Sequence, residues 1–355
     1  MAGSELTNFE VGTILNPLHS QYNGVEPIAD VVQIDYPARL SAMLLDPSRV
    51  TSDIDSIYPA GQLMFSAGIH TNITARLTES GEITVTKTTP RAGMVRHAGL
   101  LVQKALGFTE GVELDVQEVN FRHSGLGTSG ATLAGSMAAV NELFGKPIHP
   151  LTLARHSVHN YGEEIDGDDS QLVHVKSIGG SALCGAIEGG LIITAGEAVP
   201  IYQKKLPEEL KIVLGVPSDF EPAQAEMLMR AEADMSGSQI SAGTRAPGVA
   251  YKLIHEVLPG LILKDLDPLK SLIFAHRWDR GSIERCSFMY PRMTEIAESL
   301  RDLQHDSRAA IISLSSLGPA FFGLTEDPPY LRQRFSDQGM ETLIANVHNG
   351  TYTVH

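Results

Sequence analysis

The sequence predicts an α+β fold made of two domains, or of one large domain with two lobes. Strand-like and helix-like segments follow one another without a regular β-α-β repeat, which favours mixed or antiparallel sheets with packed helices. The length of 355 residues is sufficient for two such units. An apolar content of 43% with 6% aromatic residues is typical of a protein with a buried core.

The chain is acidic, with a formal net charge of −15 and no stretch rich in Lys and Arg. This argues against nucleic acid and anionic membranes as partners, because both need a basic surface. Cys184 and Cys286 are far apart in the sequence, which favours a reducing compartment. No apolar run has the length of a membrane span, and residues 1–17 lack the features of a signal peptide. We therefore expect a cytoplasmic protein, with a homodimer as a reasonable oligomeric state.

The first third of the chain is rich in strand-like segments. Residues 1–30 are mixed and turn-rich, and we interpret them as an N-terminal arm. Three regions after the arm carry clear patterns: residues 31–46 (two strands broken at Pro37), residues 64–77 and 83–87 (a hairpin through 79–82), and residues 94–105 (a helix that ends at Gly107).

The most specific stretch is residues 120–132, which lies between a predicted strand and a predicted helix. Residues 112–117 alternate apolar and polar side chains, as a half-buried strand does. Residues 133–144 repeat apolar side chains on one face of a helix. The stretch between them combines glycines with hydroxyl side chains. Backbone amides at a helix N-terminus bind anions, and hydroxyls add donors or a magnesium ligand, so we interpret it as a phosphate-binding turn.

The remaining residues continue the mixture of helices and strands. A helix from Pro150 to about Tyr161 leads into an acidic stretch at 162–169, which we interpret as a flexible, solvated turn. Glu163 is the acid in it that we expect to face the glycine-rich turn through a divalent metal. A polar linker at 204–209 separates an N-terminal lobe from a C-terminal lobe, which are residues 31–203 and 204–355. Further segments are predicted as follows: strands at 178–194, 210–216 and 309–313, and helices at 221–234, 250–263 and 290–304.

Two common phosphate-binding motifs do not fit the glycine-rich turn. The dinucleotide fingerprint follows a near-continuous apolar strand early in a β-α-β unit, whereas the strand here alternates and lies a third of the way into the chain. A Walker-type loop needs Gly-Lys-Ser/Thr, and Gly145-Lys146 is followed by proline.

The run Gly125-Leu-Gly-Thr-Ser-Gly-Ala131 resembles the second motif of the GHMP kinase superfamily, whose usual form is Pro-x-x-x-Gly-Leu-Gly-Ser-Ser-Ala-Ala. Ser315-Ser-Leu-Gly-Pro-Ala-Phe-Phe322 resembles the third motif, a turn that closes over the phosphates. The resemblance implies a two-lobed GHMP-type fold with the anion site between the lobes. It also implies a set of binding residues: Gly125, Leu126, Gly127, Thr128, Ser129, Gly130, Ala131, Ser316, Gly318 and Pro319.

One branch of the superfamily is similar over more of the chain. Residues 36–46 resemble the Ala-Arg-Leu…Leu-x-Asp signature of beta-ribofuranosylaminobenzene 5′-phosphate synthases, and residues 189–196 resemble their Gly-Gly-Phe-Ile-Val-Asp-Gly-Gly stretch. Pyrazole C-nucleoside synthases of the formycin and pyrazofurin type belong to the same branch. The resemblance implies that phosphoribosyl pyrophosphate and an aromatic carboxylate form a carbon–carbon bond, with loss of CO₂ and pyrophosphate.

Such a reaction implies roles for particular residues. Mg²⁺ and backbone amides stabilise the leaving pyrophosphate, with Ser129 and Glu163 as candidate metal ligands. Arg39 and His123 are candidates for orienting the acceptor carboxylate, and Asp46 completes the catalytic set. Arg39 and Asp46 equally fit an ion pair on an edge strand.

Two other functions remain open from the sequence. The same turn would hold ATP in a small-molecule kinase, and a non-catalytic sensor of a phosphorylated ligand could keep the fold. Three other residue types attract attention but have ordinary interpretations. We interpret His156 and His159 as plain helix positions, Cys184 as a core residue, and Trp278 as a residue outside the site.

Overall fold

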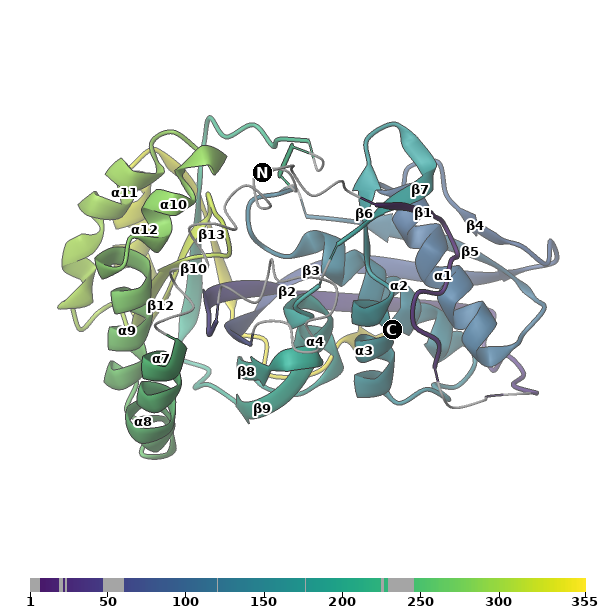
Figure 1. Ribbon diagram of the computed structural model, residues 1–355, viewed down its shortest axis with the longest axis horizontal. Helices are drawn as coiled ribbons and strands as arrows, with labels where there is room; N and C mark the ends of the chain where they lie inside the picture. The colour runs from purple at the N-terminus through teal and green to yellow at the C-terminus, as the bar shows by residue number, and fades with distance from the viewer. Residues whose placement is uncertain are drawn as a thin grey trace.

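Two long antiparallel strands, β2 (Val31–Leu44) and β3 (Gln62–Thr78), run through the centre of the protein (Figure 1). The computed structural model describes residues 7–18, 22, 24–46, 61–119, 121–175, 177–224, 227–228 and 246–355. The prediction of two strands broken at Pro37 is wrong, because β2 is continuous. A shift of register against β3 between Pro37 and Ala38 accommodates the missing proline N–H.

The large sheet has the strand order β14-β2-β3-β5-β4, and β8 extends it by pairing with β3. The predicted hairpin of residues 64–77 and 83–87 is wrong, because β4 pairs in parallel with β5 instead of turning back on β3. Local sequence could not show this, since β5 enters the sheet from further along the chain. The remaining strands of this sheet are β4 (Ile83–Val85), β5 (Gly111–Gln117), β8 (Leu191–Ala195), β9 (Val199–Lys204) and β14 (Thr353–Val354).

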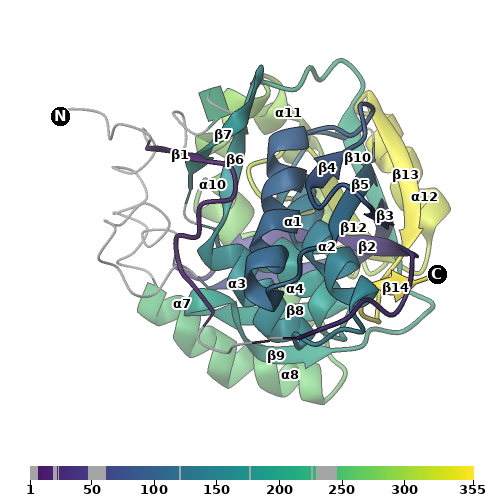
Figure 2. The same cartoon turned by 90° about the vertical axis from the view of Figure 1, so that its right-hand side faces the viewer.

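Helices of the N-terminal half pack on the large sheet, and Figure 2 shows α1 and α2 in front of its strands. Their side chains share one hydrophobic core with Ile34, Ile73 and Leu114 of the sheet. The helix predicted to end at Gly107 is confirmed, because Gly107 is the left-handed C-cap of α1. The helices are α1 (Ala92–Leu106), α2 (Thr128–Leu143), α3 (Pro150–His159) and α4 (Gly180–Ala186), and a 3-10 turn, η2, covers Gly196–Ala198.

The acidic stretch forms part of a small three-stranded sheet. Its strands, in spatial order, are β1 (Asn8–Glu10), β7 (Asp168–His174) and β6 (Gly162–Ile165). The prediction of a flexible turn at 162–169 is therefore wrong. Asp166-Gly167 is the two-residue turn between the paired strands, and Gly167 has a φ of +85°. Asp-Gly is a typical dipeptide of a β-hairpin turn. The high charge of the segment led to the prediction of a solvated turn instead.

The C-terminal half combines a four-stranded antiparallel sheet with a layer of helices (Figure 1). The strand order is β11-β12-β10-β13. The strands are β10 (Lys211–Pro217), β11 (Ile311–Leu314), β12 (Phe321–Thr325) and β13 (Met340–Asn346). The α-helices within the described residues of this half are α7 (Ala246–Lys252), α8 (Leu258–Ile262), α9 (Asp267–Phe274), α10 (Ser282–Arg285), α11 (Met293–Ser299) and α12 (Pro328–Ser336). Two π-helical segments are η3 (Leu253–Val257) and η4 (Ala275–Asp279), and two 3-10 turns are η5 (Ser287–Met289) and η6 (Arg301–Gln304).

The two halves share a hydrophobic core. Leu40 of β2 and Phe65 of β3 belong to the same buried cluster as Ile212 of β10 and Phe322 of β12. The rings of Phe65 and Phe322 lie edge to face with centroids 5.8 Å apart. Near its end the chain returns to the first half, where β14 pairs with β2. The lobe boundary at 203/204 stays a prediction.

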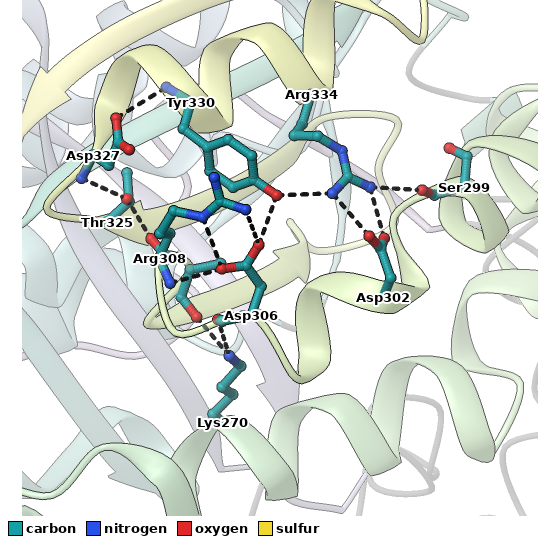
Figure 3. A network of polar contacts seen from close by, with 10 residues as sticks. Lys270, Ser299, Asp302, Asp306, Arg308, Thr325, Asp327, Tyr330 and Arg334 are labelled. Carbon is teal, nitrogen blue, oxygen red and sulfur yellow. Dashed lines mark hydrogen bonds and ion pairs between the residues drawn. The ribbon is translucent and has the colours of Figure 1, made fainter.

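A polar network fastens α12 to the segment that precedes β11 (Figure 3). Tyr330 donates from its hydroxyl to Asp306 at 2.7 Å, and the guanidinium of Arg308 stacks on its ring at 3.5 Å from the centroid. Hydrogen bonds from Arg308 and then Tyr330 hold the pKa of Asp306 well below its usual value. Arg334 of α12 pairs with Asp302 at 2.6 Å. These contacts hold α12 against the segment that precedes β11.

The α+β class predicted from the sequence is confirmed by this arrangement. The helix predicted at 221–234 lies mostly outside the described residues. The N-terminal arm is partly described, and β1 within it pairs with β7. No helix in the described ranges has both the length and the apolar character needed to cross a bilayer.

Candidate active site

The glycine-rich turn leads directly into α2. Gly125 and Gly127 have φ values of +99° and +70°, and Gly127 is the N-cap of the helix. A Cβ on Gly127 would overlap the hydroxyl of Ser181 and lie 2.8 Å from both Nε and Nη2 of Arg39. Glycine is therefore required here, because it lets a guanidinium and a hydroxyl approach the backbone at the start of a helix. Asn120, at the beginning of the motif, lies outside the described residues.

Ser181 reaches the turn because α4 begins beside α2. Gly179, with a φ of +81°, is the N-cap of α4, and Ser181 is the second residue of the helix. The hydroxyl of the buried Tyr36 donates to the carbonyl of Ala182 at 2.5 Å, which fixes α4 against β2. The N-termini of two helices thus converge on Gly127.

The two glycine-rich turns contact each other although they are far apart in the sequence. The hydroxyl of Ser315 donates to the carbonyl of Gly125 at 2.8 Å, and the amide of Ala320 donates to the carbonyl of Ser124 at 3.1 Å. The amide of Ser316 donates to the carbonyl of Ser41 in β2 at 2.9 Å. The C-terminal turn is thereby attached to both the first turn and the central strand.

These elements enclose a cavity of about 320 Å³. Most of the predicted site residues line it: Arg39, His123, Gly125, Leu126, Gly127, Thr128, Ser129, Gly130, Glu163, Ser316 and Gly318. Asp46, Ala131 and Pro319 are not among the lining residues. Ala131 is buried in α2, and Pro319 follows a cis peptide bond from Gly318. Because Asp46 does not line the cavity, we leave it out of the catalytic group proposed below.

Arg91 supports the wall of the cavity behind Ser129. It is buried, and its Nη1 donates to the Ser129 hydroxyl at 2.7 Å. The same guanidinium is paired with Glu118 at 3.4 Å and Glu164 at 3.1 Å. Its charge is therefore compensated within the protein, which is the usual condition for a buried ion.

Glu164 links Arg91 to His123. The distance from Glu164 Oε1 to His123 Nε2 is 3.5 Å, and Arg122 pairs with the same carboxylate. Burial tends to raise the pKa of Glu164, but the hydrogen bond from His123 and the charges of Arg91 and Arg122 lower it to about 2. Glu164 is therefore ionised at neutral pH and holds His123 at the edge of the cavity.

A magnesium ion fits this cavity at Glu163 better than at Ser129. Glu163 lines the cavity, and its Oε2 accepts a hydrogen bond from Tyr161 at 2.6 Å. Mg²⁺ typically binds one or two carboxylates together with substrate phosphates. Ser129 already accepts a hydrogen bond from a guanidinium, so a metal on the same oxygen would lie close to a second positive charge. Within the described ranges, no group of three or more His, Cys, Asp or Glu side chains could hold a metal ion by itself.

A further part of the cavity lining comes from the C-terminal half and was not predicted from the sequence. Arg277 of η4 and Arg285 of α10 line the cavity together with His276. The sequence has four arginines from residue 277 to residue 292 of an otherwise acidic chain, and this local positive charge could have indicated an anion-binding region. Arg91 and Ser181 carried no comparable local pattern. Trp278 lies outside the cavity lining, since its ring stacks on Phe274 and its Nε1 donates to the carbonyl of Ala297 at 2.8 Å.

Comparison with known proteins identifies the fold. Residues 93–172 match the sequence profile described as the GHMP kinases N terminal domain. The structure is similar to homoserine kinase from Cytophaga hutchinsonii, with a TM-score of 0.61 at 14% identity over 93% of this chain and 99% of that chain. The chain has the GHMP kinase fold.

Other proteins with the GHMP kinase fold are equally similar. Mevalonate pyrophosphate decarboxylase from Streptococcus pyogenes gives a TM-score of 0.61 at 12% identity, over 92% of this chain and 99% of that chain. L. major mevalonate kinase in complex with R-mevalonate gives a TM-score of 0.61 at 12% identity, over 92% of this chain and 100% of that chain. No curated protein sequence matches the chain significantly. Since kinases and decarboxylases both occur among these neighbours, the GHMP kinase fold does not by itself select the reaction.

Proposed function

We propose that this chain is a C-riboside synthase that joins ribose 5-phosphate, from phosphoribosyl pyrophosphate, to a carboxylated aromatic or heteroaromatic ring. The sequence resemblance to the C-nucleoside synthase branch of the GHMP superfamily motivates the proposal. The observation that carries it is the group of donors around Gly127: the first amides of α2, the hydroxyl of Ser181 and the guanidinium of Arg39.

This group suits a diphosphate that departs with negative charge. Donors fixed before the reaction stabilise developing charge without having to reorganise. Arg39 is held in place through its backbone, whose amide donates to the carbonyl of Leu126 at 3.1 Å. We therefore assign Arg39 to the leaving pyrophosphate, while the sequence alone suggested the acceptor carboxylate.

The proposed reaction has two bond changes at the ribose and one at the acceptor. The bond between C1 and the pyrophosphate oxygen breaks, and its electron pair leaves with pyrophosphate. A ring carbon of the acceptor forms a bond to C1. The bond from that ring carbon to its carboxylate then breaks, CO₂ leaves, and the electron pair restores the aromatic ring.

The acceptor ring would occupy the apolar part of the cavity. Leu44, Val158 and Ile178 are among the apolar residues of the lining. We assign His123 to orienting the acceptor carboxylate, because its ring lines the cavity and Glu164 holds it from behind. Glu163 would hold Mg²⁺ with the donor phosphates, and the ion would supply further neutralisation of the leaving charge.

The alternative is an ATP-dependent small-molecule kinase. Two of the structural neighbours above are described as kinases, and Glu163 is the one carboxylate among the described lining residues that could act as a base. In that case Gly127 and Arg39 would hold the triphosphate, and Glu163 would accept the proton of the acceptor hydroxyl.

One assay separates these functions. The protein is incubated with Mg²⁺ and either phosphoribosyl pyrophosphate plus a panel of heteroaromatic carboxylates, or ATP plus small-molecule alcohols. The proposal predicts release of pyrophosphate and CO₂ in the first reaction and no ADP in the second. ADP without pyrophosphate would overturn it in favour of a kinase. Tight binding of the phosphorylated donor without any turnover across the panel would identify a sensor.

A further inference from the structure

Arg277 is a buried cation at the cavity wall with neutral partners. It is 4% exposed. Its Nε and Nη2 donate to the carbonyls of Ala42 and Ser41 at 2.7 and 3.0 Å, and its Nη1 donates to the carbonyl of Ser316 at 3.0 Å. Serine hydroxyls supply its remaining contacts, from Ser282 and Ser313 at 3.3 Å each. Among the residues that the structure describes, no carboxylate pairs with Arg277.

Positive charge accumulates around Arg277 instead of being neutralised. Burial lowers the pKa of Arg277 to about 10; the neighbouring Cys286 acts against this shift, and the charges of Arg39 and Arg285 act with it. Arg285 lines the same cavity, and its Nη1 donates to the backbone carbonyl of Arg280 at 2.9 Å. His276 is buried between these groups, and burial together with the arginine charges holds its pKa well below the usual value. His276 therefore contributes a neutral ring.

Among the described residues, Arg277 differs from Arg91 in having no carboxylate partner. Both guanidiniums are buried, but Arg91 is paired with Glu118 and Glu164. A buried charge without an opposite charge is costly. Most N–H groups of Arg277 are already donated within the protein, so Arg277 would act on a phosphate mainly through its charge, and Arg285 would supply hydrogen bonds to the phosphate oxygens. An anionic group of a ligand would supply the negative charge that the described residues do not place beside Arg277.

We propose that Arg277 and Arg285 form a second anion subsite that binds a phosphate monoester. In the reaction proposed above, on which this assignment rests, the group is the 5-phosphate of the donor. A dianionic phosphate matches two guanidiniums better than a single carboxylate does. The cavity would then bind charge at two places, the diphosphate at Gly127 and the monoester at Arg285. ATP carries its charge at one end, so it would leave the second subsite unneutralised.

The test measures two small ligands separately by calorimetry: inorganic pyrophosphate and ribose 5-phosphate. Arg285→Gln is the diagnostic variant, because Arg285 is half-buried and donates one hydrogen bond to the described part of the chain, whereas Arg277 also holds β2 and the C-terminal turn. We expect Arg285→Gln to weaken ribose 5-phosphate by about tenfold or more and to leave pyrophosphate within about twofold. Arg285→Lys should lose less, since it keeps the charge.

The matched control is Arg292→Gln, which removes the same charge from an exposed arginine that pairs with Glu295 outside the cavity. It should leave both affinities unchanged. Unchanged binding of ribose 5-phosphate to Arg285→Gln, or equal weakening of both ligands, would overturn the second subsite. If ribose 5-phosphate binding depends on Arg285 while the wild-type protein releases no pyrophosphate from phosphoribosyl pyrophosphate, the subsite stands and the proposed reaction falls.

Discussion

Replacing Gly127 with alanine is the sharpest perturbation of the proposed diphosphate site. The new methyl group would overlap the Ser181 hydroxyl and lie 2.8 Å from two nitrogens of Arg39, so these side chains must move away from the turn. Charge-assisted hydrogen bonds of the kind that Arg39 would make contribute about 1.5–3 kcal/mol each. Losing one of them corresponds to a fall in affinity of about 10- to 150-fold.

An alanine at position 127 would also destabilise the fold, because the backbone there has a positive φ. Gly339 offers a control for this effect. Gly127 has a φ of +70°, and Gly339 has a φ of +74° with open space where an alanine methyl group would stand. Gly339→Ala should therefore lower the free energy of unfolding by about 1–2 kcal/mol without touching the cavity. We expect Gly127→Ala to be destabilised to a similar extent, because the nearest atoms that its methyl group meets belong to side chains and not to the backbone.

Calorimetric titration with pyrophosphate and urea denaturation of both variants provide the two measurements. The expected pattern is a loss of pyrophosphate affinity in Gly127→Ala alone, with comparable loss of stability in both. If Gly127→Ala binds pyrophosphate as tightly as Gly339→Ala does, the anion does not bind at this turn.

Three further perturbations report on the surroundings of the site. Arg91→Met should lower the free energy of unfolding by about 3–5 kcal/mol, because Glu118 would lose its ion pair and Glu164 would keep only its contacts with Arg122 and His123. A loss below about 1 kcal/mol in urea denaturation would contradict this. Since the folded pKa of Glu164 is about 2, below its ordinary 4.5, its contribution is present above pH 4.5 and is lost as the pH falls toward 2. Unfolding experiments across that range should show a shallower pH dependence for Glu164→Gln than for the wild type, and parallel curves would refute the assignment. Tyr330→Phe removes the hydroxyl that donates to Asp306 and should lower the free energy of unfolding by about 0.5–1.5 kcal/mol. Ligand affinities should stay unchanged, and altered pyrophosphate binding would show that the network of Figure 3 is coupled to the cavity.

Local patterns in the sequence identified the elements that surround the first glycine-rich turn. The alternation at 112–117 and the helical periodicity after Thr128 correspond to β5 and α2. Gly107 ends α1 because a left-handed C-cap favours glycine wherever the helix lies in the fold. These features depend on neighbours in the sequence, so they can be predicted without tertiary structure.

Features that depend on distant partners were missed or misassigned. The placement of β4 beside β5 requires knowledge of which strand enters the sheet next. Arg277 lies at the cavity because its donors reach carbonyls of β2, more than 230 positions earlier in the chain. The catalytic role that a motif resemblance suggested for Asp46 stays a prediction, and the residue does not line the cavity. Resemblance in sequence identified the fold more securely than it identified individual roles.

The hydrogen bonds between the two glycine-rich turns have a consequence for ligand association. Ser315 and Ala320 bind Gly125 and Ser124 through the protein's own groups, and Arg277 fixes Ser316 to the central strand. The main-chain groups of these two turns are therefore preorganised, so the turns lose little conformational entropy on binding. We therefore expect these two turns to add no slow step to association, so that they leave its rate to diffusion and charge. Added salt should then mainly lower the association rate, because it screens the charges of Arg277 and Arg285.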